Sequence, residues 1–229
     1  MRPNNPASLA AMLDQTLLKP TAGFAEAAAW MAASKDAGFA SLCVSPFLVP
    51  LAAEQLAGRR TKVCSVCGFP LGYALTETKV EEAVQLVMLG CAEVDMVMNV
   101  AAFLGGEMEY VRSEIEAVVL AVTEESEGQA IVKVILETGY LDEPQVAQAS
   151  TLVAEAGGAF VKTSTGFGPR GASVRDIEIM RSAVGTALGV KASGGIRGYE
   201  DAISMIEAGA DRIGTSAGLE IITQARNER

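Results

Sequence analysis

Short apolar stretches alternate with longer amphipathic ones along the whole chain. The short stretches are rich in β-branched residues and show no regular alternation of polar and apolar positions, as expected for parallel strands that are buried on both faces. The longer stretches are rich in Ala, Glu and Met, and several end at a glycine where a helix C-cap would lie. This pattern predicts eight strands, at 13–18, 41–47, 63–69, 93–100, 132–138, 159–165, 189–194 and 211–217.

Helices are expected between these strands. Eight strands that alternate with helices are typical of a (β/α)₈ TIM barrel, an α/β fold of roughly 250 residues. A doubly wound open sheet is the alternative, but its usual six or so strands fit the pattern less well. No linker or shift in composition divides the chain, so residues 1–229 are interpreted as a single barrel domain with an extra N-terminal helix at 4–13. The linking helices are predicted at 24–38, 47–58, 74–90, 107–126, 143–157, 173–185 and 199–209.

Composition narrows the class of protein. Half of the 229 residues are hydrophobic, which is enough for a sizeable core and also consistent with a subunit interface. The net charge of −10 argues against a protein that binds duplex nucleic acid, because such a protein needs a basic face. No apolar run reaches the length of a membrane span, and the N-terminus lacks the features of a signal peptide. We therefore expect a cytoplasmic protein with no membrane partner.

The chain contains four cysteines and no histidine. Cys64 and Cys67 form a C-x-x-C motif, but residues three apart in a strand point to opposite faces. A zinc site would also need a second pair of ligands. We interpret the cysteines as buried, reduced thiols and predict no metal site. Without histidine, acid–base chemistry must fall to Lys, Asp, Glu, Tyr or water.

Two lysines lie inside apolar strands, each just before a glycine turn. Lys162, in FVKTSTGFG, is four residues before Gly166, and Lys191, in VKASGGIRG, is three residues before Gly194. In a barrel, both would lie near the catalytic, C-terminal ends of adjacent strands. A structural ion pair would explain a single buried lysine, but two on neighbouring strands favour chemistry.

The chemistry that two such lysines favour is Schiff-base formation. Only a neutral amine attacks a carbonyl group, and a free lysine is neutral in roughly one molecule per thousand at pH 7. Burial and a neighbouring ammonium group both lower the pKa of a lysine. We therefore expect the two lysines to activate each other, so that one is the nucleophile while the other remains charged, and the residues alone do not indicate which is which.

Four other charged residues in the predicted strands deserve comparison with the two lysines. Asp95, in EVDMVMNV, would pair with a lysine or relay a proton through water, although a purely structural ion pair is an equal alternative for this residue alone. Lys133 lies further from the end of its strand, so we interpret it as structural and paired with an acid. Glu137 has the same strand parity as Lys133 and lies nearer the catalytic end. Asp14 is a weaker candidate of the same kind.

Glycine-rich loops follow the last three predicted strands. Loops after strands seven and eight of such barrels often bind phosphate through backbone N–H groups. Ordinary tight turns would explain any one of them, but three in succession favour an anion site, to which Arg197 would add charge. The glycines concerned are Gly166, Gly194, Gly195 and Gly214, the last followed by Thr215 and Ser216.

With these motifs the chain resembles the deoxyribose-phosphate aldolase family, which consists of class I aldolases with a barrel fold. The resemblance extends from LDQTLLKP at 13–20 through CVSP, VCGFPLG, EVDMVMNV and KVILETGYL to IGTSAG, and FVKTSTGF together with KASGGIR is its most specific part. Members of the family often have histidine where this chain has Gln15. That histidine is not required by the mechanism, so we expect Gln15 to leave the activity in place.

The resemblance implies reversible cleavage of 2-deoxy-D-ribose 5-phosphate to acetaldehyde and D-glyceraldehyde 3-phosphate, without a metal or other cofactor, in a dimer or tetramer. By similarity, Lys162 is the Schiff-base lysine, Lys191 the lysine that tunes it, and Asp95 the acid of a proton relay. The implied substrate-binding residues are Asp14, Thr16 and Thr165 near the sugar hydroxyls, and Gly166, Gly194, Gly195, Gly214 and Ser216 around the phosphate.

Two other functions remain open from the sequence. One is a different lysine-dependent barrel aldolase or lyase that acts on another phosphorylated sugar or a keto acid. The other is a barrel that binds phosphate without catalysis, against which the complete set of Lys162, Lys191 and Asp95 argues.

Overall fold

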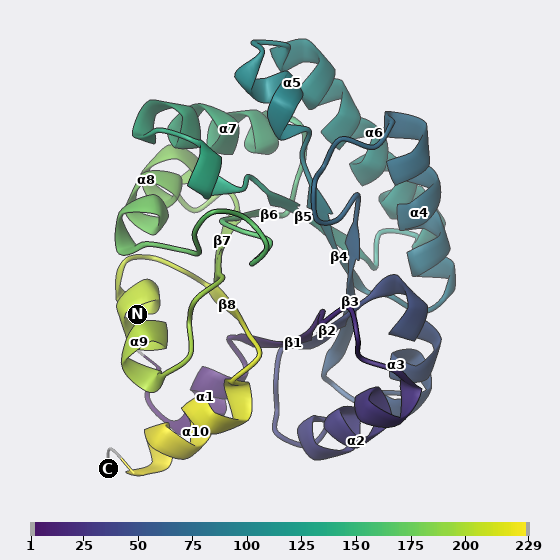
Figure 1. Ribbon diagram of the computed structural model, residues 1–229, viewed down its shortest axis with the longest axis vertical. Helices are drawn as coiled ribbons and strands as arrows, with labels where there is room; N and C mark the ends of the chain where they lie inside the picture. The colour runs from purple at the N-terminus through teal and green to yellow at the C-terminus, as the bar shows by residue number, and fades with distance from the viewer. Residues whose placement is uncertain (1–2, 228–229) are drawn as a thin grey trace.

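The computed structural model describes residues 3–227, in which eight parallel strands close into a barrel. Each strand pairs with the next one along the chain, and β8 pairs with β1 to close the ring. Figure 1 looks into this ring, with the helices arranged around its outside. The predicted (β/α)₈ TIM barrel is thus confirmed. The strands are β1 (Leu13–Leu17), β2 (Ser41–Val44), β3 (Lys62–Cys67), β4 (Glu93–Val97), β5 (Ile131–Ile135), β6 (Phe160–Lys162), β7 (Gly189–Ser193) and β8 (Arg212–Thr215).

Helices connect the strands and cover the outside of the barrel. The extra N-terminal helix is present as α1 (Pro6–Ala10), which begins at an Asn5 cap and packs against the last helix. None of the helices in residues 3–227 is both long and apolar enough to cross a membrane. The other helices are α2 (Phe24–Ser34), η1 (Pro46–Leu48), α3 (Val49–Gln55), α4 (Thr76–Met88), α5 (Val100–Leu104), α6 (Met108–Glu125), η2 (Thr138–Tyr140), α7 (Glu143–Glu155), α8 (Val174–Val184), α9 (Tyr199–Glu207) and α10 (Gly218–Asn227).

Several strands end earlier than the sequence predicts. β4 stops at Val97 rather than at residue 100, because the Asn99 side chain accepts a hydrogen bond from the N–H of Ala102 (3.0 Å) and caps α5, which was not predicted. β5 stops at Ile135, so Glu137 lies beyond the strand and strand parity does not apply to it. Asn99 and Glu137 thus belong to the loops that follow β4 and β5 rather than to the sheet.

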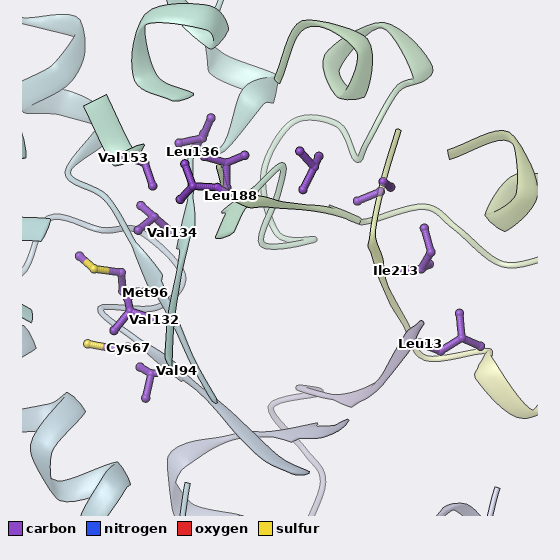
Figure 2. Packing of buried hydrophobic residues seen from close by; sticks show 14 of the residues in the cluster. Leu13, Cys67, Val94, Met96, Val132, Val134, Leu136, Val153, Leu188 and Ile213 are labelled. Carbon is purple, nitrogen blue, oxygen red and sulfur yellow. The ribbon is translucent and has the colours of Figure 1, made fainter. Parts of the chain in front are cut away.

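The apolar residues of the strands point outward, where they pack against the helices. In β4 and β5 these are Val94, Met96, Val132 and Val134, which Figure 2 shows on the side of the strands that faces the helices. The residues between them point into the barrel and are largely charged. The core between strands and helices therefore fixes the strand register, and that register places the charged groups inside the barrel.

Candidate active site

A cavity of about 410 Å³ opens at the C-terminal ends of the strands. Loops after β1, β6, β7 and β8 form its wall, and among the buried lysines of the barrel only Lys162 reaches it. Seven of the predicted substrate-binding residues therefore meet around one space. They are Thr16, Thr165, Gly166, Gly194, Gly195, Gly214 and Ser216.

Lys162 and Lys191 meet at a single carboxylate oxygen. The two residues are partners across the β6–β7 ladder. The Nζ atom of each lies 2.7 Å from Oδ2 of Asp95, which projects from β4. Asp95 is fully buried and Lys191 is 1% exposed, so this contact is screened from water. The structure thus brings together the three residues that the sequence analysis assigned to catalysis.

Lys133 holds the other oxygen of the same carboxylate. Its Nζ lies 2.7 Å from Oδ1 of Asp95 and 2.7 Å from Oε2 of Glu93, and the side chain is fully buried. The expectation that Lys133 is paired with an acid is confirmed. Because Oδ1 is occupied by Lys133, Oδ2 of Asp95 is turned toward Lys162 and Lys191.

Asp14 lies behind Lys191 and does not line the cavity. Its Oδ2 is 2.5 Å from Nζ of Lys191, and its Oδ1 accepts hydrogen bonds from Arg212 and from the hydroxyl of Ser41 (2.6 Å). The structure therefore separates Asp14 from the other residues that were assigned to the sugar hydroxyls. Arg212, which also pairs with Glu93, belongs to the same network, although the sequence analysis had not selected it.

The surrounding carboxylates keep Lys191 charged. Burial alone would lower its pKa, but Asp14 and Asp95 outweigh this effect and raise the pKa above its ordinary value. Burial would likewise raise the pKa of Asp95, but Lys133, Lys162 and Lys191 hold it well below the ordinary range. The charged state of Lys191 agrees with the expectation that one of the two lysines remains charged, but the net effect on Lys191 is to raise its pKa rather than to lower it, because two carboxylates lie beside it.

The glycines of the loops after β7 and β8 leave the backbone open to close approach by a ligand in the cavity. Gly194 and Gly195 have φ angles of +88° and +81°, a region that side chains disfavour. A Cβ atom at Gly214 would lie 2.9 Å from Cβ of Ser193 and 3.2 Å from Cε of Lys191. A side chain at position 214 would therefore displace the buried lysine as well as narrow the cavity.

Some residues that line the cavity were not predicted from the sequence. Leu17 lines the cavity at the end of β1, Leu18 and Lys19 line it directly after this strand, and Phe167 lines it after β6. The rule that barrel sites lie at the ends of strands could have identified them. Gln15 accepts a hydrogen bond from the N–H of Gly218 (2.8 Å) and thereby supports the loop that follows β8.

All four cysteines are buried and free. Cys64 points into the barrel, whereas Cys67 points outward and donates to the carbonyl of Lys79 (3.2 Å), as the strand geometry predicted. Within residues 3–227, one group has the spacing of metal ligands, namely Cys43, Cys64 and Asp95, whose ligand atoms lie within 4.8 Å of one another. The ammonium groups around Asp95 would repel a cation there, so this group is a poor metal site.

Acid is expected to weaken the fold through the buried aspartates. Burial would raise the pKa of Asp14, but Lys191, Lys133 and Arg212 hold it well below 3.8. A carboxylate with a depressed pKa stabilises the fold above the pKa that it has in the unfolded chain, and this contribution is lost as the pH falls further. In urea unfolding between pH 7 and pH 2.5, the free energy of unfolding should decrease below pH 4 less steeply in Asp14→Asn than in the wild type.

The exposed Asp36 provides the control for this experiment. Asp36→Asn should have the wild-type slope of the free energy of unfolding against pH. A wild-type slope in Asp14→Asn as well would show that Asp14 gains no stability from its ion pairs.

Comparisons with known proteins agree with this geometry. The model of the DeoC/LacD family aldolases matches residues 8–224. The chain is 51% identical over 221 residues to the deoxyribose-phosphate aldolase of Caldanaerobacter subterraneus subsp. tengcongensis, which covers 96% of this chain and 95% of the relative. It is 48% identical over 221 residues to the enzyme of the same name from Thermococcus gammatolerans, with 96% of this chain and 97% of the relative covered.

Solved structures are similar over the same length. The aldolase QR15 superposes with a TM-score of 0.89 at 40% identity and 96% coverage of both chains. The tetrameric deoxyribose phosphate aldolase of Aeropyrum pernix superposes with a TM-score of 0.89 at 34% identity, over 100% of this chain and 95% of that one. The chain therefore belongs to the DeoC/LacD family of aldolases.

Proposed function

We propose that the chain is a deoxyribose-phosphate aldolase that reversibly cleaves 2-deoxy-D-ribose 5-phosphate to acetaldehyde and D-glyceraldehyde 3-phosphate through an imine on Lys162. The observation that carries this proposal is the position of Lys162. It is the buried barrel lysine that reaches the cavity, and its Nζ lies against the carboxylate oxygen that it shares with Lys191. The names of the relatives supply the substrate.

The first step in the synthetic direction is attack by the neutral amine of Lys162 on the carbonyl carbon of acetaldehyde. The carbinolamine that results loses water and becomes an iminium ion. The positive nitrogen withdraws electrons and makes the adjacent methyl group acidic. Because the iminium ion is itself the electron sink, this scheme uses no metal or other cofactor.

Proton transfer and carbon–carbon bond formation follow. Asp95 and Lys191, acting through a water molecule, remove a proton from the methyl group, and the C–H electron pair forms the enamine. The enamine carbon attacks the aldehyde carbon of glyceraldehyde 3-phosphate, whose oxygen gains a proton as the new hydroxyl group forms. Hydrolysis of the regenerated iminium ion releases the product and frees Lys162, and cleavage follows the same steps in reverse.

The loops around the cavity suit a sugar phosphate. We assign the phosphate group to the backbone N–H groups of the turns after β6, β7 and β8, with Arg197 on the same wall. Thr16 and Thr165 are the candidates for contact with sugar hydroxyl groups. For Asp14 we propose a role through Lys191, because it is fully buried behind that lysine. The phosphate-binding residues in this proposal are Gly166, Gly194, Gly195, Gly214 and Ser216.

Reductive trapping tests the proposal directly. The protein is incubated with acetaldehyde and borohydride, digested, and analysed by peptide mass spectrometry. An ethyl adduct on Lys162 is the expected result. An adduct on Lys191 would keep the chemistry but reverse the roles of the lysines, and no adduct on folded protein would contradict an imine mechanism.

A substrate panel tests the specificity. Deoxyribose 5-phosphate should be cleaved in preference to other phosphorylated sugars and to keto acids. Preferential cleavage of one of these would indicate a different lysine-dependent aldolase, and absence of cleavage would leave a phosphate-binding barrel.

We also propose that the chain forms a homo-oligomer in the cytoplasm and has no nucleic-acid partner. Exposed apolar side chains, among them Phe47, Tyr73 and Leu75, are consistent with a subunit interface, and the relative from Aeropyrum pernix is described as a tetramer. The four free cysteines suit a reducing compartment. The net charge of −10 opposes binding to duplex nucleic acid.

A further inference from the structure

Glu137 adopts a backbone conformation that is unusual for its residue type. It follows β5 with φ 53° and ψ 60°, the left-handed helical region, which glycine and asparagine adopt more readily than glutamate. Residues held in this region often lie at functional sites, where surrounding contacts stabilise them. Glu137 is only 3% exposed, and this burial raises the pKa of its carboxyl group, an effect that the hydrogen bonds from Thr165 oppose. We therefore expect its contacts to offset the free-energy cost of the left-handed backbone and of the buried carboxyl group.

The side-chain hydrogen bonds of Glu137 go to the turn that follows Lys162. Its Oε2 accepts a hydrogen bond from the hydroxyl of Thr165, and both carboxylate oxygens lie 3.3 Å from the N–H of the same residue. The carboxylate also packs against Gly168, where a Cβ atom would lie 2.7 Å from Cδ of Glu137. Residues 165–168 thus wrap around this one carboxylate.

The same turn forms part of the cavity wall. Thr165, Gly166 and Phe167 line the cavity together with Lys162. Beneath them, the N–H of Thr138 donates to the carbonyl of Thr163 (2.9 Å), which ties the segment after β5 to the segment after β6. Glu137 therefore connects the end of β5 to the wall beside the lysine.

The hydrogen bonds of Thr165 determine what its hydroxyl group can offer a ligand. A hydroxyl group has one proton to donate and two lone pairs that accept. The proton of Thr165 goes to Glu137, and one lone pair accepts the N–H of Phe167 (3.0 Å). One lone pair remains. While Glu137 is ionised, the hydroxyl group of Thr165 therefore has no proton left for a ligand and acts toward it as an acceptor.

We propose that Glu137 is a positioning residue that fixes Thr165 as a hydrogen-bond acceptor for the hydroxyl group of the phosphorylated aldehyde substrate. This inference rests on the proposed function. Glyceraldehyde 3-phosphate has one hydroxyl group, on the carbon between its aldehyde and its phosphate-bearing carbon. Thr165 lies between Lys162 and Gly166 in the chain, and all three residues line the cavity, so it is adjacent both to the segment that carries the imine and to the proposed phosphate site. Acetaldehyde has no hydroxyl group, and imine formation should not depend on Glu137.

The test compares two acceptor aldehydes in the synthetic direction. The kcat/KM for D-glyceraldehyde 3-phosphate is measured beside that for 3-oxopropyl phosphate, which lacks the hydroxyl group, in the wild type, Glu137→Gln and Glu137→Gly. The wild type should prefer the hydroxylated aldehyde by about tenfold or more, since a site built for a hydroxyl group discriminates against an analogue that lacks it. The ratio of the two kcat/KM values should approach one in Glu137→Gly. It should be intermediate in Glu137→Gln, whose amide oxygen still accepts a hydrogen bond from Thr165.

Glycine suits the left-handed backbone of position 137, so Glu137→Gly removes the carboxylate without adding backbone strain. Glu114→Gln is a matched control, because Glu114 is also a buried carboxylate, paired with Lys79 (2.8 Å) away from the cavity wall. It should lower the melting temperature and keep the wild-type preference. If Glu137→Gly does not fold, the preference between the two aldehydes is measured in Glu137→Gln instead.

Reductive trapping of acetaldehyde on Lys162 is measured in every variant and should change less than about twofold. A wild-type preference that persists in Glu137→Gly, or in Glu137→Gln where that variant alone folds, would overturn the inference. So would equal rates for the two aldehydes in the wild type, or loss of trapping in parallel with the loss of preference. Failure of trapping in the wild type would instead contradict the proposed function itself.

Discussion

Lys162→Ala is expected to lower the rate of deoxyribose 5-phosphate cleavage by about 10⁴-fold or more, as removal of a covalent nucleophile commonly does. Lys19 also lines the cavity, but its side chain is 58% exposed and paired with Glu26 (2.9 Å), so it lacks the buried contact with Asp95 that Lys162 has. The measurement is the cleavage rate at saturating substrate, together with reductive trapping by acetaldehyde. Both signals should disappear.

The fold should survive this substitution. Asp95 keeps its ion pairs with Lys133 and Lys191 when Lys162 is absent, so no buried carboxylate is left unpaired. Circular dichroism and urea unfolding check this expectation. Lys62→Ala is the matched control, because Lys62 is exposed at the opposite end of its strand. Cleavage by Lys162→Ala at a rate near that of Lys62→Ala would refute the role of Lys162 as nucleophile.

Lys191→Met is expected to slow proton transfer by about 10²- to 10⁴-fold, the range typical of a lost acid–base group. Lys191 stays charged between Asp14 and Asp95, and in the proposed scheme it and Asp95 move the methyl proton. Exchange of the methyl protons of acetaldehyde with deuterated water, followed by NMR, measures this step without the second aldehyde. Trapping on Lys162 should persist, because the nucleophile remains.

The same substitution should also destabilise the protein by about 3–5 kcal/mol, the usual cost of removing one partner of a buried ion pair. Asp14 loses its contact with Lys191 at 2.5 Å, whereas Asp95 keeps two other lysines. In Lys191→Met, Asp14 keeps its pair with Arg212 but its Oδ2 has lost the contact with Lys191. The double variant Lys191→Met, Asp14→Asn removes this carboxylate charge and should recover part of the stability but none of the exchange rate. Recovery of exchange in the double variant would assign Lys191 a purely structural role.

The positions of Lys162 and Lys191 could be predicted from the sequence because the signals that indicate them are local. Lys162 and Lys191 each lie a few residues before a glycine turn, and the barrel rule places such residues near the cavity whatever their partners are. Lys133 could be recognised as structural for the same reason, because its distance from the end of its strand can be counted. Position along one strand is information that a linear pattern carries.

The charge states of the buried lysines and aspartates could not be predicted from the sequence in this way. Asp14 reaches Lys191 from β1, and Lys133, Lys162 and Lys191 reach Asp95 from three other strands. The sign of the pKa shift of Lys191 depends on which of these charges lies nearest. The sequence suggested two ammonium groups side by side, whereas the folded barrel places a carboxylate between them.

By itself, the sequence determined the barrel, the order of its strands, the two lysines and the glycine loops, because each depends on residues close together along the chain. Only the tertiary structure decided that Asp14 lies behind Lys191, that β4 ends at Val97, and that Glu137 holds the turn at Thr165. These features depend on contacts between residues that closure of the barrel brings together from distant strands. A hydrogen bond or ion pair of this kind is set by the register of the packed strands, and a linear pattern does not contain it.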